Sequence, residues 1–194
     1  MKKRVVLVAC VLAIASAAAA QPQPPAASSQ PVPLVTEVQN IYNGIKGYIT
    51  KSAAQFPEEK LTWQPTPAVR SWARLIAHIS DDNNGSCAVL AGAQRPARLD
   101  TEDTPNSAAN KMTKADLEKA LADSFALCDK AFASLTDANM MERNGNRSKI
   151  GTLIYDTSHI NEHYGNIVTY MRLNNMVPPS TAGMAPPAGG RGRM

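Results

Sequence analysis

The feature that most constrains the fold of this chain is the recurrence of apolar residues at intervals of three and four positions. The first stretch with this spacing contains Val35, Val38, Ile41, Tyr42, Ile45, Tyr48 and Ile49. Such spacing places the apolar side chains on one face of an α-helix, and it predicts an amphipathic helix over about 35–55. Pro57 cannot continue a helix, so the helix is expected to end before it.

Three later stretches repeat this spacing. The second helix is expected to start within 67–71 and to reach about Leu90, and the third and fourth to cover about 113–135 and 152–173. No stretch alternates apolar and polar residues as a half-buried strand does. We therefore predict an all-α protein, a four-helix bundle over residues 34–177.

The connections between these helices differ in length and composition. Residues 91–112 are rich in Gly, Pro, Asn and charge, as expected of a long crossover between two helices of a bundle. Thr113 and Asp116 form a capping pattern that would open the third helix. Residues 137–151 are expected to form a second loop around the turn sequence at 144–146.

The N-terminus has the pattern of a secretory signal peptide. Basic residues at 2–4 precede an apolar run at 5–14 and a run of small residues that ends at Ala20. We expect cleavage near Ala20 and a periplasmic or secreted mature protein. Acylation at Cys10, as in a lipoprotein, is the disfavoured alternative, because the apolar run continues past that residue. No later run has the length and apolarity of a membrane span.

Two further segments are too polar or too rich in proline to build a core. Residues 21–33 are mostly Pro, Gln, Ala and Ser and predict a disordered spacer, and residues 178–194 predict a disordered tail. Without residues 1–20, 17 basic residues face 16 acidic ones. This balance gives no basic field for nucleic acid or anionic lipid, so neither is an expected partner.

Two cysteines remain after signal cleavage, Cys87 and Cys128. Because exported proteins fold where thiols are oxidised, we expect a disulfide between them. The alternative is a pair of buried free cysteines that pack as small apolar residues.

The chain has only three histidines, and two of them stand four residues apart in the fourth helix. On a helix, His159 and His163 would lie on one face, and a divalent metal ion would satisfy both imidazoles. His78 lies at the border of the apolar face of the second helix and would supply a third ligand, leaving a position for water. A hydrogen-bonded histidine cluster without metal is the alternative.

Three acidic residues lie near these histidines in the sequence. Asp82 follows His78 by one helical turn, and Asp156 precedes His159 by one turn. Either carboxylate would orient an imidazole N–H or act as a further ligand. Glu162 is a candidate general base near a bound water, and an ordinary surface residue is the favoured alternative.

Two segments resemble the DinB-like superfamily, in particular its exported bacterial members of unassigned function. They are residues 65–81, which contain the Ser71-Trp72-Ala73-Arg74-Leu75-Ile76-Ala77-His78 sequence, and residues 158–180, which contain the His-x-x-x-His pair and Pro178-Pro179. The resemblance implies an up-down-down-up four-helix bundle. It also implies a metal site made by His78, His159 and His163, the same residues that the spacing indicates.

Characterised members of that superfamily include thiol-dependent isomerases and S-transferases. The resemblance therefore implies thiol chemistry, and the open coordination position of a three-histidine site would carry water for hydrolysis. We expect a metal-dependent enzyme, a hydrolase or an S-transferase, that acts on a small molecule with Zn²⁺ or Ni²⁺ as the cofactor. The alternative is a non-catalytic bundle in which the metal or the histidine cluster is structural. A homodimer is compatible with both.

Overall fold

A computed structural model describes residues 31–101 and 106–183 of the chain. The predicted signal peptide, Cys10, nearly all of the spacer and the tail beyond residue 183 lie outside the described residues. All the elements described below belong to one unit that begins at Val32.

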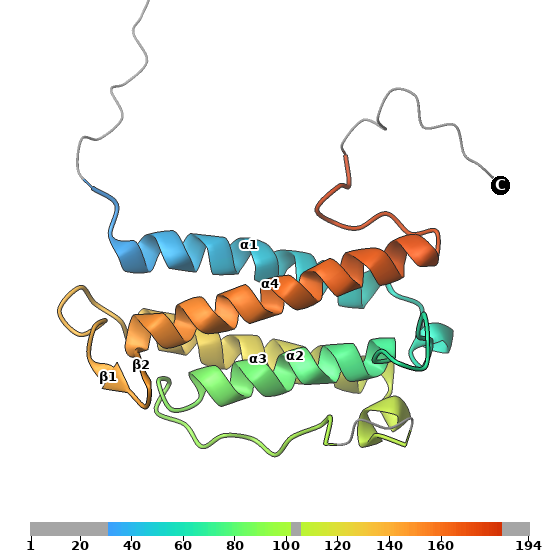
Figure 1. Cartoon of the computed structure of the whole chain (residues 1–194), viewed down its shortest axis with the longest axis horizontal. Coiled ribbons are helices and arrows are strands. Elements are labelled where there is room, and N and C mark those ends of the chain that lie inside the picture. Colours follow the sequence, from blue (N-terminus) through green and yellow to red (C-terminus); the bar gives the residue numbers. More distant parts are fainter. Residues whose placement is uncertain (1–30, 102–105, 184–194) are drawn as a thin grey trace, which may run out of the picture. The chain divides into compact units, whose positions relative to one another are not determined.

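Four α-helices form a bundle: α1 (Leu34–Gln55), α2 (Trp72–Cys87), α3 (Lys114–Ala133) and α4 (Lys149–Leu173). Helices α1 and α4 run in one direction and α2 and α3 in the other, which is the up-down-down-up arrangement (Figure 1). Helix α1 packs against α3 and α4, and α2 packs against the same two helices. The predicted all-α fold and its direction of helices are confirmed.

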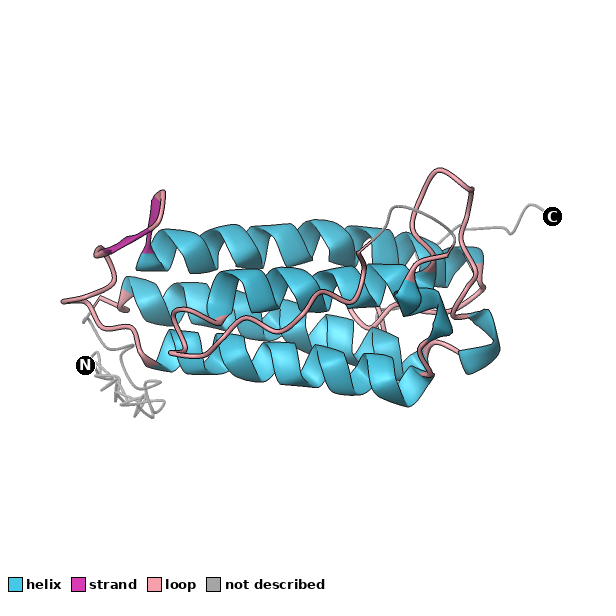
Figure 2. Ribbon diagram, turned by 90° about the horizontal axis from the view of Figure 1, so that it is seen from below, coloured by secondary structure: helices cyan, strands magenta, loops and turns pink. Residues whose placement is uncertain are grey.

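The connection between α2 and α3 runs back along the bundle, as two consecutive parallel helices require (Figure 2). It includes a short 3-10 helix at Ala108–Lys111, and another such helix, Glu58–Lys60, lies between α1 and α2. The predicted crossover is confirmed, and its described part brings Asp100 against α2. Arg74 of α2 holds the Asp100 carboxylate, with Nε 2.9 Å from Oδ1.

A small β-hairpin replaces part of the loop that we predicted between α3 and α4. Strands β1 (Arg143–Asn144) and β2 (Arg147–Ser148) are antiparallel, with Gly145 at a φ of 61° in the turn between them. The hairpin places Ser148 at the start of α4, where its hydroxyl accepts a hydrogen bond from the Gly151 backbone N–H. Helix α4 therefore begins at Lys149, earlier than predicted.

The helix ends follow the local chemistry of their flanking residues. Thr113 and Asp116 form the predicted capping box at the start of α3. Helix α2 starts at Trp72 with Ser71 as its cap, and it ends at Cys87 rather than at Leu90. Past the end of α4, Asn175 adopts a left-handed conformation with a φ of 59°.

Aromatic and aliphatic side chains from all four helices fill the core. Tyr42 of α1 is fully buried against Phe125 and Phe132 of α3, and its hydroxyl donates a hydrogen bond to the Phe125 carbonyl. The Phe56 and Trp72 rings stack with centroids 3.6 Å apart. Within the described ranges, no helix combines the length and apolarity needed to cross a membrane.

Buried polar side chains interrupt this core on several faces of α2 and α4. Asp81 accepts hydrogen bonds from the Leu99 and Asp100 backbone N–H groups, and Asn83 donates one to Ser124 of α3, whereas His163 lies beside His78 of α2. The buried ones on these two helices are Arg74, Ser80, Asp81, Asn83, Asn84, Asp156, Thr157 and His163. Buried polar groups are costly unless they have partners, so a functional site is expected where buried polar atoms lack one.

The first residues of the predicted tail lie against the bundle. Pro178 is buried, and the Ser180 backbone N–H donates a hydrogen bond to the Tyr164 hydroxyl at 3.1 Å.

Candidate metal centre

The structure brings together all three histidines of the chain, from two adjacent helices. His78 lies near the middle of α2, and His159 and His163 lie one turn apart on α4. The ring centroids are 5.7 Å apart for His78 and His159, 4.7 Å for His78 and His163, and 4.6 Å for the pair on α4. The i, i+4 spacing and the packing of α2 on α4 together create this group.

A carboxylate oxygen lies among the imidazole nitrogens. Asp82 Oδ2 is 2.9 Å from His78 Nε2 and 3.2 Å from His159 Nε2. The Nε2 atoms of His159 and His163 are 2.8 Å apart. One potential ligand atom from each of the four residues falls within 4.8 Å of the others. We call these four residues the histidine group.

Asn166 fixes the orientation of one of these rings. Its Oδ1 lies 3.2 Å from His163 Nδ1, and because an amide oxygen only accepts, Nδ1 carries the proton. The His163 Nε2 atom therefore presents its lone pair to the histidine group. The buried Nδ1 of His78 has no hydrogen-bond partner among the described residues.

Burial and charge set the protonation of this group. Burial lowers the pKa of His163, and the neighbouring imidazoles lower it further against the effect of the Asn166 hydrogen bond. Burial alone would raise the pKa of Asp82, but its hydrogen bond with His78 and the histidine charges hold that pKa below its usual value. A neutral His163 beside an ionised Asp82 is the protonation state that binds a cation.

The donor set fits a divalent metal ion. A neutral imidazole has one N–H and one lone pair, so two Nε2 atoms at 2.8 Å repel unless a proton or a cation lies between them. Three imidazole nitrogens and one carboxylate oxygen are ligands that both Zn²⁺ and Ni²⁺ accept. The exposed fractions of the His78, His159 and Asp82 side chains are 12%, 26% and 25%, so the group is open to solvent on one side.

The other acidic candidates lie elsewhere. Glu162 is exposed on the outer side of α4, which agrees with the surface alternative. Asp156 is buried beside the disulfide, with Oδ2 3.8 Å from Cys87 Sγ and 3.7 Å from Cys128 Sγ. It does not belong to the histidine group, and the sequence expectation that it orients His159 receives no contact in support.

The two cysteines form a disulfide that joins the end of α2 to α3, with Cα atoms 4.9 Å apart. Both residues are fully buried. The bond agrees with the sequence expectation for Cys87 and Cys128. It lies further along α2 from the histidine group.

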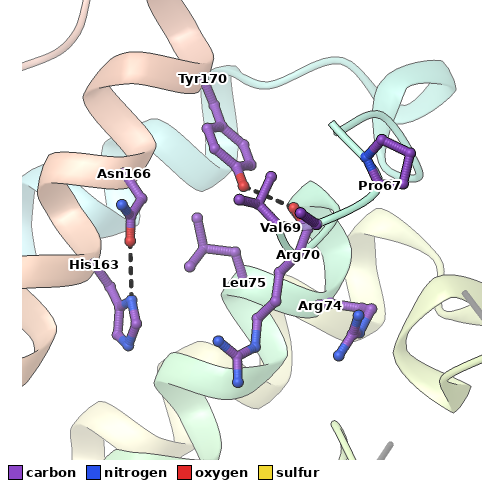
Figure 3. A pocket seen from close by; sticks show the side chains of 9 residues that line it. Pro67, Val69, Arg70, Arg74, Leu75, His163, Asn166 and Tyr170 are labelled. Atoms are coloured by element: carbon purple, nitrogen blue, oxygen red, sulfur yellow. Dashed lines mark hydrogen bonds between the residues drawn. The ribbon is translucent and has the colours of Figure 1, made fainter. Parts of the chain in front are cut away.

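A cavity of about 450 Å³ adjoins the histidine group at His163. Its lining residues are Pro67, Ala68, Val69, Arg70, Arg74, Leu75, His163, Asn166 and Tyr170. In Figure 3 the side chains from α4 form one side of this cavity, and the other side carries Arg70, from the segment before α2, and Arg74, from the first turn of α2. We call this cavity the arginine recess.

Asn166 and the other lining residues of the recess, except His163, were not among the predicted site residues. Asn166 follows His163 by three positions, a spacing that brings side chains together on a helix and so carried a usable signal. Arg70 and Arg74 stand before and within α2 in a basic pattern four residues apart, but the sequence does not reveal that α4 lies opposite them.

Comparisons with known proteins agree with this architecture. A crystal structure of a conserved protein from Enterococcus faecalis is similar in fold, with a TM-score of 0.59 and 17% sequence identity, over 74% of this chain and 98% of that one. No protein of curated function matches the sequence. The family model for the DinB superfamily matches residues 48–171, which include the whole histidine group and most of the bundle, and the chain therefore belongs to the DinB superfamily.

Proposed function

We propose that this protein is a metal-dependent enzyme of the cell envelope that holds a divalent ion, Zn²⁺ or Ni²⁺, through His78, His159, His163 and Asp82. The observation that carries the proposal is the convergence of three Nε2 atoms and one carboxylate oxygen, at 2.8 to 3.2 Å between neighbours, between α2 and α4. The two Nε2 atoms of His159 and His163, 2.8 Å apart, repel unless a proton or a cation lies between them, and a divalent ion would remove that repulsion.

The reaction we propose is hydrolysis or thiol transfer on a small molecule. A bound divalent ion supplies Lewis acidity to a water, a thiol or a carbonyl oxygen. The protein's own residues do the remaining work. Asn166 keeps His163 Nε2 directed at the histidine group, and the adjoining recess admits a ligand beside it.

The compartment is part of the proposal. We propose that residues 1–20 direct export and are removed near Ala20. The buried disulfide between Cys87 and Cys128 supports this, because such bonds persist where thiols are oxidised. Mass spectrometry of the mature protein tests it directly: the expected chain begins at Gln21, and a chain that keeps Met1 or carries lipid at Cys10 would contradict it.

Turnover separates the enzyme from a structural metal site. Purified protein loaded with Zn²⁺ or Ni²⁺ is assayed on a panel of esters, amides and thiol conjugates. We expect turnover that chelation abolishes and that His163→Ala lowers by at least about 100-fold. Glu162→Ala, on the exposed side of the same helix, is the matched control and should retain activity.

One result would contradict the proposed enzyme activity. A protein that binds the ion stoichiometrically, melts at a lower temperature with chelator and turns over nothing on the panel would be a non-catalytic bundle with a structural metal site.

A further inference from the structure

We propose that Arg95 and Arg147, which we call the loop arginines, bind an oxyanion of the substrate, a carboxylate or a phosphate, beside the histidine group. The substrate class is then a small anionic molecule. This inference deepens the proposed function, and it rests on that function for the role of the bound anion.

Arg95 lies in the crossover between α2 and α3, and its guanidinium packs on Gly85 of α2. A Cβ atom added to Gly85 would stand 2.9 Å from Arg95 Nη2 and 3.1 Å from Arg95 Cζ. Gly85, Asp82 and His78 project from one face of α2, because they are spaced at three and four positions. The Arg95 guanidinium therefore lies on the face of α2 that carries two members of the histidine group.

The packing of Arg95 gives a physical reason for the glycine at position 85. Gly85 is an exposed residue inside a helix, where alanine would be more favourable. Any side chain at this position would push the Arg95 guanidinium away from α2. The glycine thus weakens the helix locally but allows the guanidinium to approach the histidine group.

Arg147 lies in β2, and its guanidinium covers the ring of Tyr155 in α4. Arg147 Cζ is 3.9 Å from the centroid of that ring. The same ring stands edge-on to the His159 ring, with centroids 5.9 Å apart. The Arg147 guanidinium is therefore no farther from the His159 ring than these two distances combined, which is within the length of a small molecule.

Both loop arginines lie at the same end of the histidine group. Asp82 Oδ2 is 3.2 Å from His159 Nε2, across the contact between α2 and α4. Gly85 comes one turn after Asp82 in α2, and Tyr155 comes one turn before His159 in α4. Because the two helices run in opposite directions, both steps lead toward the end of the bundle where the hairpin and the start of the crossover lie (Figure 1).

The charges of the loop arginines are available to a ligand. Both residues are exposed, and neither guanidinium has an ion-pair or hydrogen-bond partner among the residues that the structure describes. Each is nevertheless held against a firm surface, one on the backbone of a helix and the other on an aromatic ring. A guanidinium fork matches the oxygens of a carboxylate or a phosphate, and its prior ordering lowers the entropic cost of binding.

The test is an NMR titration of the full mature protein, metal-free and Zn²⁺-loaded, with succinate and with inorganic phosphate. The Nε–Hε signals of the loop arginines are assigned from the variants Arg95→Gln and Arg147→Gln. We expect both signals to shift to saturation with at least one oxyanion, and the neutral molecule succinamide to shift neither. The comparison of succinate with phosphate distinguishes a carboxylate ligand from a phosphate ligand.

Gly85→Ala is the sharpest variant, because its methyl group displaces the Arg95 guanidinium while alanine favours the helix. It should weaken oxyanion binding about tenfold, as the loss of a charge-assisted hydrogen bond does. In the turnover assay it should raise KM for anionic substrates and leave KM for neutral ones unchanged. Gly44→Ala in α1 is the matched control, since a Cβ atom there meets nothing within 4 Å, and it should bind as the wild type does.

Two results would overturn the assignment. In the first, the signal of either loop arginine shifts no more than that of Arg172, an exposed arginine at the far end of α4. In the second, Gly85→Ala binds the oxyanion as tightly as Gly44→Ala does. The metal-free titration separates this inference from the proposed function, because failure of the loop arginines leaves the metal content intact and absence of a metal ion leaves their titration intact.

Discussion

Two groups of potential metal ligands each include residues of α2 and α4, and they differ in whether their atoms are available to bind an ion. The histidine group offers lone pairs to a partly open site. The second group, Cys87, Cys128 and Asp156, is equally tight but fully buried, and its two sulfurs are bonded to each other. Proximity of ligand atoms alone therefore does not make a metal site; the atoms must also be unbonded and reachable.

The difference assigns separate roles to the two groups. The disulfide group holds α2 to α3 and should set stability, whereas the histidine group should set metal binding. A change in the disulfide group should leave metal binding intact, and a change in the histidine group should leave the stability that the disulfide provides intact. The predictions below test that independence.

The largest expected effect comes from removing the disulfide. The bond closes a loop with a sequence separation of 41, and loss of such a cross-link costs about 4 kcal/mol of unfolding free energy in the chain-entropy model. We expect the double variant Cys87→Ala, Cys128→Ala to lose about that much in urea denaturation. Its metal stoichiometry should equal that of the wild type. Loss of the metal from the folded variant would show that the disulfide group and the histidine group do not act independently.

A smaller effect is expected from the carboxyl beside the disulfide. Burial raises the pKa of Asp156 to about 7, against a hydrogen bond with Ser86 that favours the charged form. A raised pKa means that the folded state binds the proton more tightly than the unfolded state. The contribution of Asp156 to the free energy of unfolding is therefore full at acid pH and is lost as the pH rises toward 7.

Chelated wild-type protein should lose about 2 kcal/mol of unfolding free energy between pH 5 and pH 7 relative to Asp156→Asn. Urea denaturation at several pH values measures this difference. Parallel pH profiles for the two proteins would show that Asp156 is ionised in the fold over that range.

The smallest effect concerns the orientation of one imidazole. Asn166→Ala removes the acceptor for His163 Nδ1 and leaves the ring free to change tautomer. Groups that orient a metal-binding histidine typically contribute 10-fold or more in affinity, so we expect about a 10-fold weaker metal Kd. Competition with a chromophoric chelator measures it, with Glu162→Ala as the exposed control on α4. If Asn166→Ala and Glu162→Ala bound the metal with equal affinity, Asn166 would have no role in orienting His163.

Local patterns in the sequence predicted most of the fold. The apolar spacing identified all four helices, and the Thr113 and Asp116 cap placed the start of α3 correctly. The hairpin at Arg143–Ser148 was missed because two-residue strands are too short to show an alternating pattern. The start of α4 was misplaced for the same reason, since the hairpin positions the capping Ser148.

The site was predictable only as far as helical spacing reaches. His159 and His163 are brought together by one helix, and Asp82 follows His78 by one turn, so these pairs could be read locally. Spacing alone could not assign Asp156, whose Oδ2 lies against the disulfide because α2 packs against both α3 and α4. The recess at Arg70 likewise depends on contacts between residues a hundred positions apart, as the Tyr170 hydrogen bond shows.

The most direct test of the central claim is the metal content of the native protein, recovered from the cell envelope without chelator and measured by elemental analysis. We predict about one equivalent of Zn²⁺ or Ni²⁺ per chain, lost in His163→Ala and retained in the variant without the disulfide. A folded wild-type protein with no stoichiometric metal, or a His163→Ala variant with the same metal content, would contradict the account.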